Sequence, residues 1–139
     1  MGNRAVIAFE GSKTGIYLHW NGGVSSVRAF LDSAKELGVR SDSYGVARLA
    51  QIIGNFFGGS LSVGVGAIES LDCNNYDNGL FWVGKDWQIV KREYDEHAER
   101  FDADYYAGVY NEVMEKNYPL FRGEEYRRAV EKQPFTTGA

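Results

Sequence analysis

The sequence is poor in cysteine, proline and histidine, and it has no long apolar run. Cys73 is the only cysteine, so one chain can form neither an internal disulfide nor a cysteine-based zinc site, which is consistent with a reducing compartment. No apolar run approaches the ~20 residues that cross a membrane, and residues 1–11 lack the apolar segment of a signal peptide. We therefore expect a soluble, cytoplasmic protein with no membrane partner.

Positive charge is also scarce. The 139 residues include 15 Lys and Arg but 19 Asp and Glu, a formal net charge of −4 at pH 7. Proteins hold phosphate backbones chiefly through clustered Lys and Arg, so this composition argues against duplex nucleic acid as the partner. A small anionic ligand needs only a few local cations, and the composition allows one.

The length and the 44% of hydrophobic residues suit a single domain with a real core. From Asp95 onward the composition becomes acidic and helical. We expect an α+β core at 1–94 and a helical extension at 95–139. The extension has too few aliphatic residues to stand alone, so it should pack on the sheet or on a neighbouring copy in a homo-oligomer.

Five segments have the composition of β-strands. Residues 4–9 and 16–20 are separated by a polar turn and predict a hairpin. Residues 60–68 alternate apolar residues with Ser and Gly, which predicts a strand with one nearly bare face. Residues 80–83 and 87–94 predict a second hairpin. We expect a mainly antiparallel sheet of about five strands, two hairpins plus a central strand, packed against two central helices.

Helical spacing marks the other segments. Residues 26–37 place their apolar side chains on one face, with a serine cap before them and Gly38 as the C-terminal cap. A helix over 103–117 should close at Pro119, because the residue before proline avoids the helical region. A last helix is expected over 124–132.

The most apolar segment with helical spacing is 44–60. Gly58 and Gly59 within it are expected to end the helix. Its apolar residues cover most of the circumference, so we expect it to be largely buried. Arg48 within it would then need a partner, because an unpaired buried guanidinium is costly. The partner is either an internal carboxylate, which burial statistics favour, or an anionic ligand, which the bidentate arginine suits.

Polar and aromatic side chains follow the second strand. His19, Trp20 and Asn21 precede two glycines and a helix, a position where backbone amides and side chains can converge on a ligand. The glycine spacings of nucleotide-binding loops are absent. The alternative is a strand-to-helix turn plugged by an aromatic ring.

Asp and Asn are concentrated at 72–79. The spacing fails the EF-hand pattern, because Tyr76 stands where an oxygen ligand is needed and no glutamate closes the loop. One interpretation is that the Asn side chains satisfy their own backbone in turns. The other is that Asn74 and Asn75 bind the edges of a ribose or base while Tyr76 stacks on the ring.

Catalysis has weaker support. Cys73 is a candidate nucleophile with His19 or His97 as its base, but no motif surrounds it. Asp72 with Asp77 is a candidate acid/base pair or divalent-ion site. We expect no catalytic residue, no metal site and no cofactor.

Three stretches together resemble a family of small, uncharacterised proteins frequent in bacteriophages and prophages: GIYLHWNGG (15–23), ARLAQIIGNFFGG (47–59) and LDCNNYDNG (71–79). The resemblance covers residues 1–94 and implies a protein that antagonises host defence in the cytoplasm of an infected bacterium. The chain also resembles anti-Thoeris sponge proteins. These combine a sheet with C-terminal helices, form oligomers and sequester cyclic ADP-ribose-type or cyclic oligonucleotide signals without cleaving them.

We therefore expect a non-enzymatic, phage-encoded anti-defence protein that sequesters a small nucleotide-type anion. The alternatives are a protein-binding inhibitor of a host defence complex and a small metal-dependent nucleotide hydrolase. The last helix would lie on a solvated face or place its arginines over a neighbouring copy. The residues expected at the ligand site are His19, Trp20, Asn21, Arg48, Phe57, Asn74, Asn75, Tyr76, Arg127 and Arg128.

Overall fold

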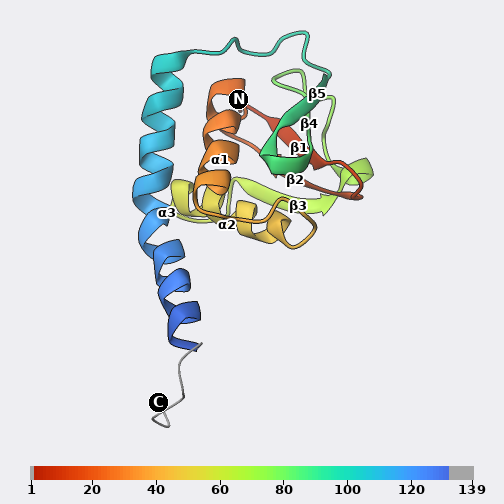
Figure 1. Cartoon of the computed structure of the whole chain (residues 1–139). Coiled ribbons are helices and arrows are strands. Elements are labelled where there is room, and N and C mark those ends of the chain that lie inside the picture. Colours follow the sequence, from red (N-terminus) through yellow and green to blue (C-terminus); the bar gives the residue numbers. More distant parts are fainter. Residues whose placement is uncertain (1, 132–139) are drawn as a thin grey trace.

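The computed structural model describes residues 2–131, with side chains described for residues 2–121 (Figure 1). The strands are β1 (Ala5–Phe9), β2 (Thr14–Leu18), β3 (Val63–Ala67), β4 (Leu80–Val83) and β5 (Ile89–Glu93). The α-helices are α1 (Val24–Glu36), α2 (Gly45–Phe57) and α3 (Ala103–Glu131), and 3₁₀ turns lie at Ile68–Ser70 and Lys85–Trp87. The fold is α+β, as predicted.

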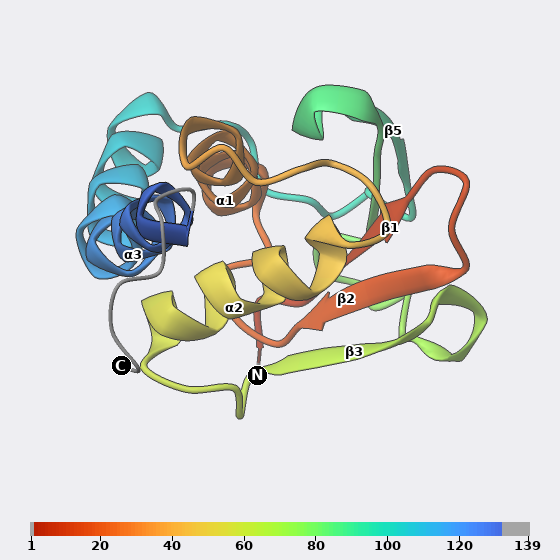
Figure 2. The same ribbon diagram turned by 60° about the horizontal axis from the view of Figure 1, so that its bottom comes forward.

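The sheet is mixed, with the strand order β3-β2-β1-β4-β5. Both predicted hairpins form, with Ala5 opposite Leu18 and Leu80 opposite Glu93. β1 and β4, however, run parallel. The segment between β3 and β4 packs on the outer face of the sheet through Leu71, so the chain returns on the far side of β1. The strand expected at 60–68 is β3, and it lies at an edge rather than in the centre (Figure 2).

The main core lies between the sheet and the helices. Alternation along β1 points Ala5, Ile7 and Phe9 towards the helices and leaves Val6 and Ala8 on the outer face. α3 runs alongside α1 (Figure 1) and packs on both α1 and α2. The helices fill the core with fully or almost fully buried side chains: Phe30 and Leu31 from α1, Leu49, Ile52 and Ile53 from α2, and Val109 and Val113 from α3.

The prediction that α2 is buried around most of its circumference is wrong. Its buried side chains form one stripe, whereas Arg48 and Gln51 are exposed. Alanines and glycines widen the apolar arc of the sequence without needing a partner, so the helix buries one face only. The predicted end is confirmed: Gly58 has φ 76° and ψ 17°, the left-handed conformation of a glycine cap.

The other helix boundaries differ in part. α1 begins at Val24, two residues earlier than predicted. Its N-cap residue is Gly23, so no side chain makes a capping hydrogen bond there. The two helices predicted after residue 102 are one helix, α3, that continues through Pro119. Pro119 and Glu115 are both exposed, so water can bind the Glu115 carbonyl that loses its backbone donor.

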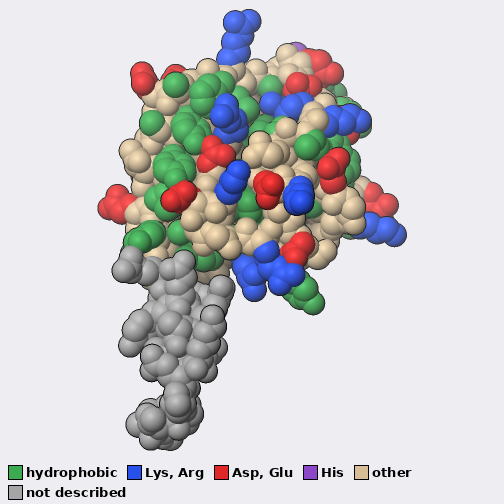
Figure 3. Space-filling model, viewed as in Figure 1, with side chains coloured by type: hydrophobic (Ala, Val, Ile, Leu, Met, Phe, Trp, Pro, Cys, Tyr) green, Lys and Arg blue, Asp and Glu red, His purple; other side chains and the backbone are tan. Residues whose placement is uncertain are grey.

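Acidic and basic side chains are interspersed over the face seen in Figure 3, with no broad area of one sign. Among the described residues, none of the helices combines the length and the apolar character that crossing a bilayer requires.

Candidate functional site

A groove of about 740 Å³ lies where α2, the edge strand β3 and the second half of α3 meet. This volume is within the usual range of small-molecule sites, about 300–1,000 Å³. Most of the lining is small or apolar. The lining residues are Ala47, Ala50, Gln51, Gly54, Asn55, Gly58, Gly59, Ser60, Val63, Val65, Lys116 and Leu120.

Hydrogen bonds between α2 and α3 hold one wall of the groove. Asn55 Nδ2 donates to Asn117 Oδ1 at 2.9 Å, and Asn117 Nδ2 donates to the carbonyls of Ile52 and Val113 at 3.1 and 2.8 Å. Asn117 is fully buried. The wall is therefore fixed in the free protein, which lowers the cost of binding a ligand there.

The described lining of the groove carries little charge. Among the residues whose side chains the structure describes, Lys116 is the only Lys or Arg that lines it; its Nζ donates to the Phe56 carbonyl at 2.9 Å and lies 3.4 Å from a Glu112 carboxylate oxygen. The Phe56 carbonyl belongs to the last turn of α2, where the helix dipole is negative. The Phe56 carbonyl and the Glu112 carboxylate thus offset much of the positive charge of Lys116. The groove suits a flat ligand of low negative charge better than a polyphosphate.

Two of the predicted site residues lie on α2, but with different surroundings from those expected. Arg48 is exposed, so the buried charge from which its role was inferred does not exist. Phe57 is half-buried and packs on Phe30 and Phe56, with ring centroids 6.5 and 5.1 Å away. Neither residue lines the groove.

His19, Trp20 and Asn21 come together at the end of β2. Tyr17 Oη lies 2.9 Å from His19 Nδ1, and the Trp20 ring meets the His19 ring edge-on at 5.1 Å. Asn21 Nδ2 donates to Ser26 Oγ and Tyr105 Oη, both at 3.1 Å, so it ties the start of α1 to α3. Trp20 is 45% exposed and is free to stack on a ligand.

The loop before β4 contains one structural asparagine and two exposed side chains. Asn75 is buried; its Nδ2 donates to the Asp72 and Gly79 carbonyls, and its Oδ1 accepts from the Asp77 and Gly79 amides. The interpretation as an asparagine that satisfies its own backbone is confirmed for Asn75. Asn74 and Tyr76 are exposed.

The two loop carboxylates surround an arginine that the sequence did not single out. Arg4 Nε lies 2.7 Å from Asp77 Oδ2, and Arg4 Nη1 lies 3.5 Å from Asp72 Oδ2. The hydrogen bond from Arg4 holds the pKa of Asp77 below its ordinary value. This arrangement keeps Asp77 ionised and links the start of β1 to the loop. Asp72 and Asp77, the candidate acid/base pair, therefore form an ion cluster with Arg4 that stabilises the loop.

Cys73 is half-buried, and its Sγ donates to the Ile68 carbonyl at 3.6 Å. Burial and then the nearby Asp72 charge raise the pKa of the thiol, which lowers the thiolate fraction that a nucleophile needs. Within residues 2–121, no three or more His, Cys, Asp and Glu side chains form a group that could hold a metal ion. The predicted site residues Arg127 and Arg128 lie outside the residues whose side chains the structure describes.

A partly buried arginine lies on β5, whereas a buried one, Arg48, was expected on α2. Arg92 lies 3.7 Å over the Phe81 ring, and its Nη2 donates to the Asn78 carbonyl at 2.9 Å. Burial lowers its pKa, and its Nε has no hydrogen-bond partner among the described residues. Arg92 stands opposite Phe81 in a register that includes an irregularity at Trp82/Val83, so the predicted hairpin did not place the two residues together.

Comparisons with protein-family models, with curated proteins and with solved structures found no match to this chain. The resemblance to phage proteins and to anti-Thoeris sponges therefore stays a prediction. The groove and the exposed aromatic residues are the features from which a function can be argued.

Proposed function

We propose that this protein binds and sequesters a small nucleotide-type molecule in the groove between α2, β3 and α3, without converting it. The groove carries the proposal, because it has the volume of a small-molecule site and mostly small or apolar walls. The resemblance makes an immune signal of an infected bacterium, either cyclic ADP-ribose-like or a cyclic oligonucleotide, the first ligand class to examine.

The lining suggests how such a ligand would lie. A base has two apolar faces, which suit the walls formed by Ala50, Val63 and Leu120. Gln51, exposed on α2, can reach the polar edge of the base. Of the described side chains in the lining, Lys116 is the one cation that can meet a phosphate, beside the negative end of α2. We therefore expect weak salt dependence, and tighter binding of a cyclic ligand of low charge than of a linear triphosphate.

The test is a thermal-shift screen of the purified chain against cyclic ADP-ribose, cyclic dinucleotides, ATP and divalent ions. A cyclic nucleotide should raise the unfolding temperature, since ligand at about a hundredfold excess over Kd adds roughly 2.7 kcal/mol. Chromatography after denaturation should then recover the ligand intact. Recovery of a converted product makes the protein an enzyme, and no shift with any compound favours a protein partner.

A further inference from the structure

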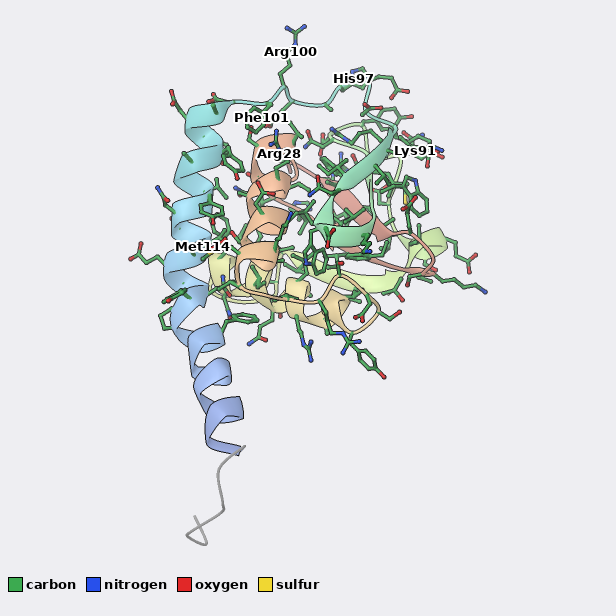
Figure 4. The ribbon with its side chains drawn as sticks, in the orientation of Figure 1. Arg28, Lys91, His97, Arg100, Phe101 and Met114 are labelled. Carbon is green, nitrogen blue, oxygen red and sulfur yellow. The ribbon has the colours of Figure 1, made fainter. Side chains whose placement is uncertain are left out.

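The strands at the two edges of the sheet, β5 and β3, differ in their charge and regularity. β5 forms one edge and carries Lys91, Arg92 and Glu93, and its pairing with β4 is irregular at Trp82/Val83. Figure 4 shows Lys91 on this strand. Charges and bulges are the usual devices that stop an edge from pairing with another chain. The β5 edge therefore has the properties of a protected edge.

β3 forms the other edge and has none of these devices. Its sequence, VGVGA, contains no charge and no proline, and residues 49–68 around it contain no Asp, Glu, Lys or Arg. Leu61 is fully exposed and Val65 is 55% exposed. In Figure 2 no described helix or strand lies outside β3. An uncharged edge that no other strand or helix covers is the kind that pairs with a further strand.

The register shows which backbone groups of β3 face outward. The His19 amide donates to the Ser62 carbonyl, and the Ile68 amide donates to the Lys13 carbonyl, so the even-numbered residues of β3 bond to β2. Val63, Val65 and Ala67 then direct their amides and carbonyls away from the sheet. Of these groups, only the Val63 amide has a hydrogen bond among the described residues, to the Ser60 carbonyl at 3.1 Å.

We infer that a second copy of this chain covers the edge, with the two β3 strands antiparallel about a twofold axis at Val65. The amide and carbonyl of Val65 bond to those of the second copy's Val65, and the Ala67 amide bonds to the second copy's Val63 carbonyl. Gly64 then lies opposite Gly66. Every facing pair is small or apolar.

The absence of charge favours a second copy over a different protein. In a twofold contact each residue approaches the same surface of its mate, so a charge near the axis would face a like charge. A different partner would accept a charged edge if its own charge were opposite. Only self-pairing requires the whole strand to be neutral, and β3 and its flanks are neutral.

Five paired residues bury less than the roughly 800 Å² per partner of a stable interface. Leu61 and Leu120, which are 106% and 55% exposed, add apolar area beside the strand. Val63 and Val65 also line the groove, so the added strand would extend its wall. The dimer does not depend on the proposed function, because the argument uses only the edge.

The test is the mass of the full-length protein in solution, measured by light scattering or sedimentation at micromolar concentration. The wild type should be a dimer. Val65→Lys should weaken the dimer by roughly tenfold or more, because two like charges meet at the axis. Val90→Lys is the matched control on the other edge: Val90 is 50% exposed, similar to Val65, and its replacement should leave the dimer intact.

Mixing two variants with opposite charges at position 65 distinguishes a lost contact from a folding defect, because misfolded chains would not regain the dimer on mixing. Val65→Lys and Val65→Glu alone should each form a weaker dimer than the wild type, and an equimolar mixture should recover tighter association than either variant alone, because opposite charges then face each other. A monomeric wild type overturns the inference. So does a Val65→Lys dimer as tight as that of the wild type, or a weaker dimer on Val90→Lys, or a mixture that associates no more tightly than either variant alone.

Discussion

Adjacent asparagines in the loop before β4 differ completely in what they contact. Asn75 is 1% exposed and bonds four backbone groups, whereas Asn74 is exposed and has no hydrogen bond among the described residues. The sequence shows two identical side chains in a polar loop. Only burial separates the structural residue from the one that is free to contact a ligand.

Asn75→Ala should therefore lower the free energy of unfolding by about 2–4 kcal/mol, because it leaves buried amides and carbonyls without partners. Asn74→Ala is the matched control and should change it by less than about 0.5 kcal/mol. Urea unfolding of the two variants measures both values. Equal effects of the two substitutions would contradict the structural role given to Asn75.

The Arg4–Asp77 pair predicts a dependence of stability on acid. The pKa of Asp77 is held below its ordinary 3.8 in the folded chain, so the stabilisation is present above that pH and is lost as the pH falls through the folded pKa. The free energy of unfolding of the wild type should decrease below about pH 4. Asp77→Asn should have a lower free energy of unfolding at pH 7, and this free energy should decrease less as the pH falls. The same acid dependence in Asp77→Asn and the wild type would contradict a stabilising role of the Arg4–Asp77 pair.

At the scale of elements, the sequence predicted what local spacing determines. Both hairpins, the amphipathic α1 and the glycine end of α2 follow from neighbouring residues. The parallel pairing of β1 with β4 joins strands about seventy residues apart, and no local pattern encodes it. The prediction that a helix ends at Pro119 was wrong, because local sequence does not show whether a helix can tolerate a proline. An exposed proline removes one backbone hydrogen bond, and the rest of a long helix can tolerate that loss.

The end of α2 gives a prediction with its control one residue away. Gly58→Ala should cost about 1 kcal/mol, because Gly58 has φ 76° and a side chain disfavours that conformation. An added Cβ at Gly59 meets no atom within 4 Å, and Gly59→Ala should be neutral within about 0.5 kcal/mol. Chemical unfolding measures both. A larger loss at Gly59 than at Gly58 would contradict the helix end described above.

The contact between α1 and α3 predicts a dependence of stability on alkali. Tyr106 Oη donates to Asp32 Oδ2 at 2.5 Å, and burial, followed by this bond, raises the pKa of Tyr106 to about 12. A raised pKa means that the stabilisation is complete below pH 10 and is lost as the pH rises towards 12.

Tyr106→Phe should therefore lower the free energy of unfolding by about 1 kcal/mol at pH 7 and flatten its decrease above pH 10. Tyr105→Phe, which removes the hydroxyl of a side chain that is 52% exposed, should have the smaller effect at pH 7. Urea unfolding between pH 7 and 11 distinguishes the two. The same alkaline slope in wild type and Tyr106→Phe would contradict the role of this hydrogen bond.

At the scale of the whole molecule, the groove and the free edge share β3. The groove combines residues of α2, β3 and α3, and its last lining residue, Leu120, is more than fifty positions after Val65. Such a site depends on tertiary packing. The sequence therefore pointed to conspicuous charged, aromatic and amide side chains, and it did not point to the small residues of the lining. Trp20, Asn74 and Tyr76 remain exposed candidates for contact with a ligand or partner.

The most direct test of the proposed function is isothermal titration of cyclic ADP-ribose, or of the cyclic dinucleotide that gives the larger thermal shift, into three proteins. The wild type should bind. Ala47→Trp should bind roughly tenfold or more weakly, because the indole occupies part of the groove. Ala107→Trp, at an exposed alanine on α3 that does not line the groove, should bind like the wild type. Equal affinity of Ala47→Trp and the wild type would contradict the assignment of the groove as the ligand site.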